Sequence, residues 1–224
     1  MRSALVTGGS SGIGFAIAAM LREEGFALTL AARTPERLEA PASELGALTV
    51  AIDVRDDADC ERVVAAHVDH HGGLDVLVNS AGVGFAGGID EQDVKRIDLQ
   101  LDVNLRGLIL VTRAALPHLR ASRGLIVNLA SIAGTEPVPQ LPVYAATKAA
   151  VISLTGSLNG TLEAEGVRVH ALCPAFVDTP MASWSGLAGD EMIQPEDCAE
   201  VVRMLLRLGP RARVPQVVIE RIGP

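Results

Sequence analysis

The stretch SALVTGGSSGIG, residues 3–14, decides the fold class, because it joins a short apolar run to a glycine-rich turn. Gly8, Gly12 and Gly14 follow the run at a G-x-x-x-G-x-G spacing. Glycine permits a tight turn and lets the backbone approach a phosphate, which then rests on the N-terminus of the next helix. The order of strand, turn and helix therefore predicts a dinucleotide site. This glycine spacing differs from the G-x-G-x-x-G pattern, since Ile17 stands at the third glycine position. The turn is not a P-loop either, because no Lys-Ser/Thr pair follows it.

Short apolar runs alternate with longer amphipathic segments along the rest of the chain. Seven runs are typical of buried strands: 3–7, 27–32, 47–53, 74–80, 124–130, 167–173 and 214–220. Their continuous valine, isoleucine and leucine content indicates strands covered on both faces, as in a parallel sheet. We expect a single α/β domain over residues 1–224, doubly wound and Rossmann-type, with a seven-stranded parallel sheet. An irregular substrate loop is expected at about residues 180–194.

Composition excludes several classes of protein. A net charge of −8 disfavours a nucleic-acid binder, because no excess of arginine and lysine is present to neutralise phosphates. No apolar window is long enough for a membrane span or a secretory signal, so we expect a cytoplasmic protein without membrane contact. The three cysteines lack a C-x-x-C pattern and predict reduced thiols. His67, His70 and His71 suit either a metal site or a helix C-terminus, and we favour the second and expect no metal.

The end of the second apolar run bears on the choice of dinucleotide. An NAD site usually has an acid there to hold the ribose 2′-hydroxyl, but this chain has Ala31, Ala32 and Arg33. A guanidinium suits a 2′-phosphate better than a diol. Arg33 therefore predicts NADP(H), with a plain surface arginine as the alternative.

The only tyrosine of the chain, Tyr144, precedes Lys148 by four residues. On a helix this spacing puts the two side chains on one face. The spacing alone is more often a tyrosine anchored in the core beside a snorkelling lysine. The surrounding motifs must decide between these interpretations.

Those motifs resemble the short-chain dehydrogenase/reductase family from residue 3 to about 181. Five segments carry the resemblance: TGGSSGIG (7–14), NSAG (79–82), VNLRG (103–107), IVNLASIAG (126–134) and YAATK (144–148). The resemblance implies a catalytic tetrad of Asn104, Ser131, Tyr144 and Lys148. Tyr144 would exchange a proton with the reacting oxygen, and Ser131 would hydrogen-bond that oxygen. Lys148 would hold the nicotinamide ribose, and Asn104 would hold a water that links Lys148 to solvent.

A free tyrosine ionises near pH 10, so Lys148 and the oxidised nicotinamide are expected to lower the pKa of Tyr144.

The resemblance also implies a set of cofactor contacts. Asp53 would accept from the adenine amino group, unless it is an ordinary loop acid. Ala175, where the family usually has glycine, is a departure at the nicotinamide end. The implied contacts are Gly8, Ser10, Ser11, Gly12, Ile13 and Gly14 in the turn, Arg33, Asp53, Val54, Asn79, Ala81 and Gly82 on the adenosine side, and Tyr144, Lys148, Pro174, Val177 and Thr179 near the nicotinamide.

We therefore expect an NADP(H)-dependent enzyme that interconverts a carbonyl and a secondary alcohol. One alternative is a 3-oxoacyl thioester reductase, with Arg106, Arg113 and Arg120 meeting an acidic carrier protein, although a solvated helix face explains these arginines equally well. Another is a regulator that senses the dinucleotide without turnover.

The expected partners follow from the same residues. The substrate is expected to be a small, mainly apolar carbonyl or alcohol, because the pocket residues we predict are uncharged: Phe85, Ile132, Val138, Leu141, Met181 and Trp184. In the resembling family the helices at about 94–120 and 143–162 pair across a two-fold axis, which implies a homodimer or homotetramer.

Overall fold

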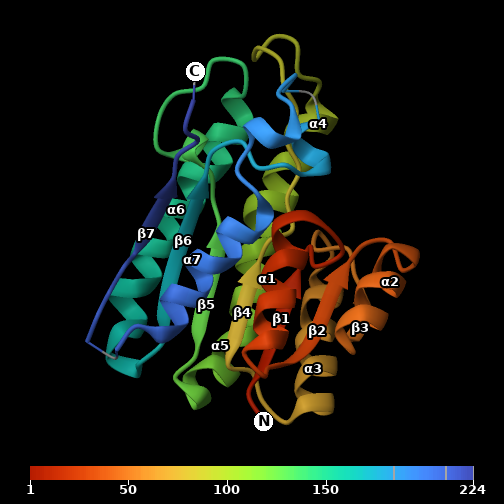
Figure 1. The fold of residues 1–224 in the computed structure, drawn as a ribbon, viewed down its shortest axis with the longest axis vertical. Helices are drawn as coiled ribbons and strands as arrows, with labels where there is room; N and C mark the ends of the chain where they lie inside the picture. The colour runs from red at the N-terminus through yellow and green to blue at the C-terminus, as the bar shows by residue number, and fades with distance from the viewer. Residues whose placement is uncertain (184, 210, 224) are drawn as a thin grey trace.

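Seven strands form one sheet in residues 1–183, 185–209 and 211–223, which the computed structural model describes. The strand order is β3-β2-β1-β4-β5-β6-β7, and every neighbouring pair is parallel (Figure 1). The strands are β1 (Ser3–Thr7), β2 (Ala27–Ala32), β3 (Leu48–Ala51), β4 (Val76–Asn79), β5 (Leu125–Leu129), β6 (Arg168–Pro174) and β7 (Gln216–Ile219). Each lies within, or extends by one residue, an apolar run of the sequence, which confirms the predicted doubly wound sheet.

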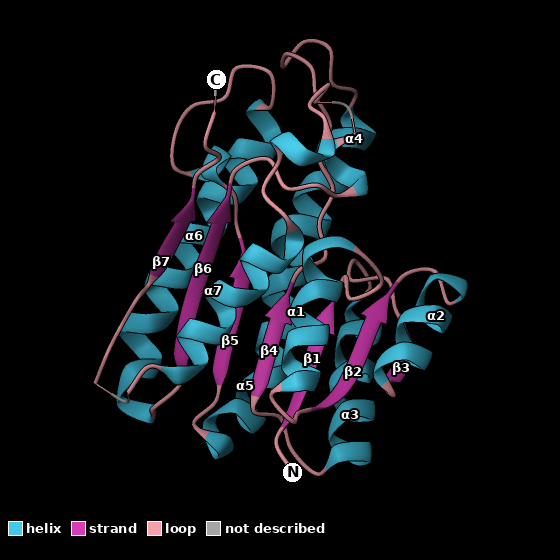
Figure 2. Ribbon diagram, in the orientation of Figure 1, coloured by secondary structure: helices cyan, strands magenta, loops and turns pink. Residues whose placement is uncertain are grey.

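Helices cover both faces of this sheet (Figures 1 and 2). One face carries α1 (Gly12–Glu23), α2 (Glu36–Leu45) and α7 (Pro195–Arg207), and the other carries α3 (Asp57–His71), α5 (Leu108–Ser122) and α6 (Pro142–Leu162). Helix α4 (Val94–Leu101) continues through a π-helical segment, Asp102–Gly107, into α5. Single 3₁₀ turns occupy Ile132–Gly134, Glu163–Glu165, Pro180–Ala182 and Gly189–Glu191. Among the described residues, none of the helices is long and apolar enough to cross a membrane.

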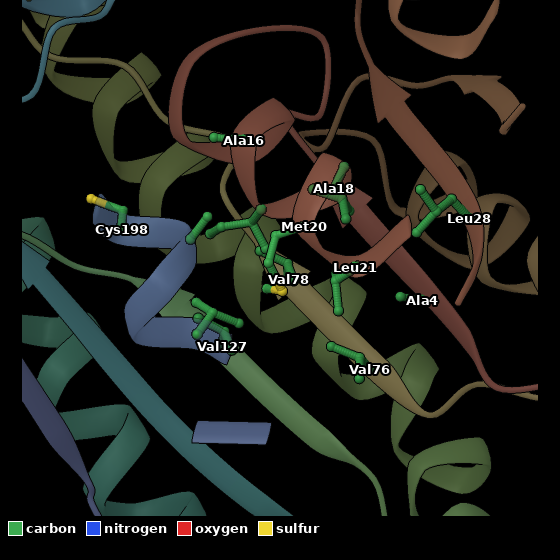
Figure 3. Packing of buried hydrophobic residues seen from close by; sticks show 14 of the residues in the cluster. Ala4, Ala16, Ala18, Met20, Leu21, Leu28, Val76, Val78, Val127 and Cys198 are labelled. Atoms are coloured by element: carbon green, nitrogen blue, oxygen red, sulfur yellow. The ribbon is translucent and has the colours of Figure 1, made fainter. Parts of the chain in front are cut away.

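Apolar side chains from α1 and α7 pack together on the middle of the sheet (Figure 3). Ala16 and Met20 of α1 and Cys198 of α7 belong to the same buried cluster as Val78 of β4 and Val127 of β5. Burying such side chains removes apolar surface from water at about 25 cal/mol per Å². This packing fixes α1 so that its N-terminus lies at the carboxyl edge of the strands.

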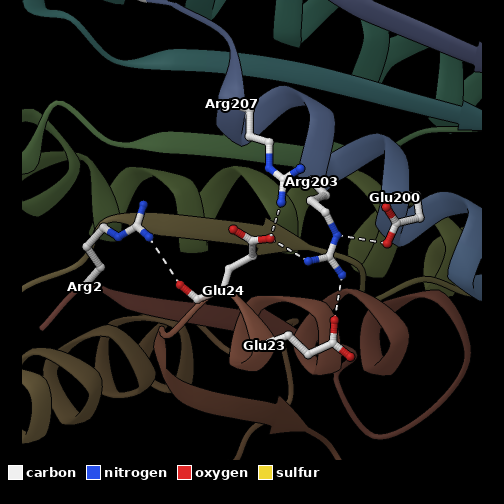
Figure 4. A network of polar contacts seen from close by, with 6 residues as sticks. All are labelled: Arg2, Glu23, Glu24, Glu200, Arg203 and Arg207. Carbon is white, nitrogen blue, oxygen red and sulfur yellow. Dashed lines mark hydrogen bonds and ion pairs between the residues drawn. The ribbon is translucent and has the colours of Figure 1, made fainter.

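A network of arginines and glutamates adds a polar connection between α1 and α7 (Figure 4). The Arg203 guanidinium lies 2.6 Å from Glu23, 2.5 Å from Glu24 and 2.9 Å from Glu200. Arg207 also donates to Glu24, at 2.9 Å. The hydrogen bond from Arg203 is the main reason that the pKa of Glu24 is lowered. The network lies at the C-terminal end of α1 and leaves its N-terminal end to the site.

The chain turns in opposite directions from β1 and β4, which are neighbours in the sheet. From β1 it crosses to β2, and from β4 it crosses to β5 on the other side. In open α/β sheets ligands bind in the crevice at such a switch point, beyond the carboxyl ends of the strands. The glycine turn follows β1 and Asn79 ends β4, so both predicted motifs lie at this crevice.

Candidate active site

The glycine turn after β1 is held in a conformation that side chains would disrupt. Gly8 and Gly12 have φ angles of +67° and +55°, in the region that favours glycine. A Cβ atom on Gly14 would lie 2.4 Å from the carbonyl oxygen of Gly8. The turn therefore needs glycine at all three predicted positions, for backbone conformation at two and close approach at the third.

The N-terminus of α1 begins at Gly12 and has no side-chain cap. Ser11 is the extended N-cap residue, its side chain makes no capping hydrogen bond, and the first turn contains no acid. Its amide groups are therefore not satisfied by a capping side chain. Thr179 borders the turn, since its Cγ2 lies 3.0 Å from a Cβ position on Gly12. Free amides, a positive helix end and close glycine backbone suit the pyrophosphate of a dinucleotide. Ser10 lies in the same turn, and Ile13 lines a cavity that begins beside it.

The predicted adenosine side contains an ion pair that the sequence did not reveal. The Asp53 carboxylate lies 2.5 Å from the Arg55 guanidinium and also accepts from the backbone N–H of Arg55, at 3.0 Å. These bonds lower the pKa of Asp53, and the exposed Arg33 lowers it further. Arg33 thus lies close to Asp53 at the ends of β2 and β3. The Asp53 carboxylate is thus paired with Arg55, a residue that the sequence analysis did not identify. The predicted contact of Asp53 with the adenine stays a prediction.

Asn79 directs its side chain into the protein. Its Nδ2 donates to Thr112 Oγ1 at 3.0 Å and to Asn128 Oδ1 at 2.9 Å, while its buried Oδ1 has no partner among the described residues. Any contact of Asn79 with a cofactor would therefore come through its backbone. Asn79 lines a narrow hollow with Val54 and Ala81, two further residues of the predicted adenosine side.

A cavity of about 370 Å³ extends from the glycine turn along the carboxyl ends of β4, β5 and β6. It brings together eight of the predicted site residues: Ile13, Gly82, Ser131, Tyr144, Lys148, Pro174, Val177 and Thr179. Three members of the predicted tetrad therefore face the same space. Apolar side chains form most of the remaining wall.

Tyr144 and Ser131 are joined by a side-chain hydrogen bond. Ser131 begins the 3₁₀ turn after β5, where its Oγ accepts from the backbone N–H of Ala133 at 3.2 Å. Tyr144 lies in the first turn of α6, and Gly84 packs against its ring. Burial raises the pKa of Tyr144, whereas the bond to Ser131 lowers it by less. The pKa of Tyr144 is therefore raised in this structure, because loss of solvation outweighs the bond to Ser131, and the lowering expected from Lys148 together with the oxidised nicotinamide stays a prediction.

Lys148 is buried on the next turn of α6. Its Nζ donates to the carbonyl oxygen of Leu129 at 2.6 Å and lies 5.5 Å from the centre of the Tyr144 ring. Burial lowers the pKa of Lys148 to about 8. The ammonium therefore stays charged at neutral pH beside the phenol.

Asn104 lies in the π-helical segment and fixes the neighbouring loop. Its Oδ1 accepts from the Val83 N–H and its Nδ2 donates to the Val83 carbonyl, both at 2.8 Å. Nδ2 also donates to Thr147 of α6 at 3.1 Å. A Cβ on Gly82 would lie 3.5 Å from Asn104 Oδ1 and 3.7 Å from Lys148 Nζ, so the two residues flank the same glycine. Because its amide is engaged, the side chain acts here as a brace, and a role in holding water stays a prediction.

The predicted substrate pocket is mostly formed as expected. Ile132, Val138, Leu141 and Met181 line the cavity, but Phe85 does not. Trp184 lies outside the described residues. The sequence missed further contributors to the wall, among them Gly84, Glu136 and Phe176. Glu136 lies five residues after Ser131 in a proline-containing loop. This closeness to Ser131 in the sequence was the only feature that could have predicted its place on the cavity wall.

Two of the three arginines considered for a carrier protein have local partners. Arg106 pairs with Asp57, and Arg120 pairs with Glu165 at 2.6 Å. Arg113 lines a surface hollow that also contains Asp57. These contacts favour a solvated helix face over a dedicated docking stripe.

The histidines at the end of α3 serve the packing of the fold. His67 is fully buried, with Nδ1 2.8 Å from Thr29 Oγ1 and Nε2 3.1 Å from Ser3 Oγ. Burial lowers the pKa of His67 to about 3. Within the described ranges, histidine, cysteine, aspartate and glutamate form no group of three that could hold a metal.

Comparisons with known proteins agree with this geometry. A family model described as short chain dehydrogenase matches residues 2–186. An uncharacterized oxidoreductase of Staphylococcus epidermidis is 37% identical, with 98% of this chain and 96% of that protein covered. An alcohol dehydrogenase of the archaeon Thermococcus sibiricus, solved with 5-hydroxy-NADP, is 31% identical with a TM-score of 0.92, covering 99% of this chain and 97% of that one. A 3-ketoacyl-(acyl-carrier-protein) reductase of Brucella melitensis, solved with NADH, is 29% identical with a TM-score of 0.90, covering 98% and 96%.

Proposed function

Because this chain belongs to the short-chain dehydrogenase family, we propose that it is a cytoplasmic, NADP(H)-dependent oxidoreductase that interconverts a carbonyl and a secondary alcohol. The observation that carries the proposal is the placement of three groups on one cavity. The Tyr144 hydroxyl is hydrogen-bonded to Ser131, and the Lys148 ammonium lies behind the ring. The cavity begins at the uncapped helix end that suits a pyrophosphate.

Each side chain has a distinct task in carbonyl reduction. When bound, NADPH supplies the hydride that reduces the carbonyl carbon. Tyr144 Oη gives its proton to the carbonyl oxygen, and Ser131 Oγ holds that oxygen in place by a hydrogen bond. The raised pKa of Tyr144 keeps the phenol protonated and ready to donate at neutral pH. Lys148 stabilises the phenolate that remains, because its positive charge lies close to the ring. In alcohol oxidation the same proton moves in the opposite direction.

The preference for NADP(H) rests on Arg33. Its guanidinium is exposed after β2, where a ribose 2′-phosphate would lie if the pyrophosphate occupies the glycine turn. Related structures hold either NADP-type or NAD-type dinucleotides, so they support nicotinamide binding without choosing between the two forms. The absence of an acid at the end of β2 favours the phosphorylated form.

The shape of the cavity and the surface support the remaining parts of the proposal. The mainly apolar wall of the cavity suits a small and mainly apolar carbonyl compound or alcohol. Val94 and Leu101 of α4 and Ile109 of α5 are exposed apolar side chains. Covering them with a second copy would remove apolar surface from water, which supports a homodimer or homotetramer.

The proposed activity is tested by following NADPH absorbance with a panel of ketones, aldehydes and alcohols. We expect turnover of apolar ketones, with turnover by the Tyr144→Phe variant lowered by at least about a hundredfold. A dinucleotide sensor would bind NADPH without consuming it in the presence of any compound. Reduction confined to acyl-carrier thioesters would instead identify the thioester reductase.

A further inference from the structure

Glu136 is a carboxylate on the wall of an otherwise mainly apolar cavity. The described residues of that wall include two charged side chains, Glu136 and Lys148. Lys148 is buried and donates to Leu129, so it belongs to the proton-transfer group. Glu136 is exposed to solvent, and within the described part of the chain its side chain has neither a hydrogen bond nor an ion pair. The described wall therefore carries one carboxylate without a partner, Glu136, in addition to the buried Lys148 ammonium.

The loop that carries Glu136 is stiff and attached at both ends. Thr135 Oγ1 donates to the Ile132 carbonyl at 2.7 Å before Glu136, and Leu141 N–H donates to the Val138 carbonyl at 2.9 Å after it. Pro137 and Pro139 restrict the backbone between these bonds. The carbonyl of Gln140 also accepts from Gly87 at 2.9 Å, which ties the loop to the segment packed on Tyr144. These bonds and prolines restrain the backbone that carries the Glu136 carboxylate.

Glu136 lies on a different segment of the cavity wall from the residues next to the glycine turn. Ile13, Pro174, Val177 and Thr179 line the end next to the glycine turn, where the dinucleotide is expected. Glu136 shares its loop with Val138 and Leu141, which were predicted to surround the substrate beyond Tyr144. A ligand that places its carbonyl at Tyr144 and extends along this apolar wall brings its far end towards Glu136.

We propose that the substrate carries a positively charged nitrogen, with an apolar chain between this group and the reacting carbonyl. The inference rests on the proposed reductase function and names the substrate class of the same site. A carboxylate at the mouth of an apolar cavity attracts a cation and repels an anion, because the low-dielectric wall weakens solvent screening. Solvent exposure of Glu136 keeps the effect moderate.

The test uses two series of methyl ketones with increasing numbers of methylene groups. One series ends in a trimethylammonium group and the other in the tert-butyl group of the same shape, so the members of each pair differ in charge. For the best-fitting length we expect a ratio of kcat/KM, cation over neutral, of about two to five. Glu136→Gln should bring this ratio close to one, and Glu136→Lys should bring it below one. Glu44→Gln, which removes an exposed charge on α2, should leave the ratio unchanged.

A binding measurement distinguishes this inference from the proposed activity. Calorimetric titration of both ketones into the NADP⁺-loaded protein should show the same preference for the cation, lost in Glu136→Gln. If the cation binds preferentially but no ketone is reduced, the reductase proposal fails while the role of Glu136 stands. If the ratio is near one at every length, is unaffected by Glu136→Gln, or if neither ketone binds, the inference about Glu136 is overturned.

Discussion

Replacing Lys148 by methionine should stabilise the fold at neutral pH while it removes activity. The Lys148 side chain is buried, and its Nζ hydrogen bond goes to an uncharged partner, the Leu129 carbonyl. Burial lowers the pKa of Lys148 from 10.5 to about 8. The folded protein therefore carries a buried ammonium at pH 7 that the unfolded chain would expose to water. Methionine has a similar length and no charge.

The magnitude follows from the pKa. At about 1.4 kcal/mol for each pKa unit, lowering the value from 10.5 to about 8 corresponds to about 3 kcal/mol of lost stability. Methionine also removes the bond to Leu129 and leaves that carbonyl without its donor, which costs about 1–2 kcal/mol. The net gain at pH 7 is then about 1–2 kcal/mol.

The direction in which the stability difference between variant and wild type changes with pH is a sharper test than the size of that difference at pH 7. Below pH 8 both states of the wild-type protein hold the Lys148 proton, and the full penalty is present. Between pH 8 and 10.5 the folded state has lost this proton while the unfolded state keeps it, so the stability of the wild type rises with pH. Above 10.5 the penalty is gone, and the methionine variant should be the less stable protein.

The assay is urea unfolding followed by circular dichroism between pH 7 and pH 10.5 without dinucleotide, because a ligand would add its own stabilisation. Buried thiols also contribute to the pH dependence, since burial raises the pKa of Cys60 and Cys173 from 9.0 to about 11 and the unfolded chain loses these thiol protons first. The Cys60 contribution cancels in the difference between variant and wild type, whereas that of Cys173 does not cancel fully, because Lys148 lowers the pKa of this thiol. Lys95→Met, at an exposed position on α4, is the matched control and should show no such pH dependence. A Lys148→Met difference that is constant with pH would refute the reasoning.

Three further predictions concern cofactor and catalysis. Tyr144→Phe should lower kcat by about a hundredfold to ten-thousandfold with an unchanged Kd for NADPH, and near-normal turnover would reduce Tyr144 to a helix anchor. Arg33→Asp should reverse a preference for NADP(H) over NAD(H) of about tenfold to a hundredfold, measured by fluorescence titration; equal affinities in the wild type would contradict the role of Arg33. Gly14→Ala should abolish dinucleotide binding and cost about 1–3 kcal/mol in urea unfolding, because the new Cβ meets the Gly8 carbonyl at 2.4 Å. Gly73→Ala, where a Cβ has open space, is its control and should bind normally.

The sequence predicted those features that depend on local rules. Most strands are mainly apolar runs, and the central ones are buried along their whole length, as in a sheet with helices on each side. The glycine turn was predictable because Gly8 and Gly12 adopt backbone angles that other residues avoid. Ser131 and Tyr144 were placed by motif, and the structure brings them into hydrogen-bond contact.

Features that depend on tertiary surroundings were not predictable from the sequence. The pKa of Tyr144 rises because the cavity wall removes solvent, an effect that no neighbour in the sequence announces. Asn79 turns inward because Thr112 and Asn128 supply acceptors on α5 and β5, far away in the chain. Glu136 was missed because a charged loop residue is normally solvated and has no role.

The pKa shifts of Lys148 and Tyr144 together indicate which protonation state of this pair the folded protein holds before a cofactor binds. Free lysine and tyrosine ionise at similar pH, but burial disfavours the charged form of each group and so moves their pKa values apart. The Lys148 pKa falls to about 8, whereas that of Tyr144 rises. As pH increases, Lys148 therefore loses its proton before Tyr144 does, and the phenol stays an acid throughout the neutral range. An acid is what carbonyl reduction requires, whereas alcohol oxidation requires a phenolate. The positive ring of the oxidised dinucleotide would lower the Tyr144 pKa only when that form is bound, so the base would be generated together with the hydride acceptor that makes use of it.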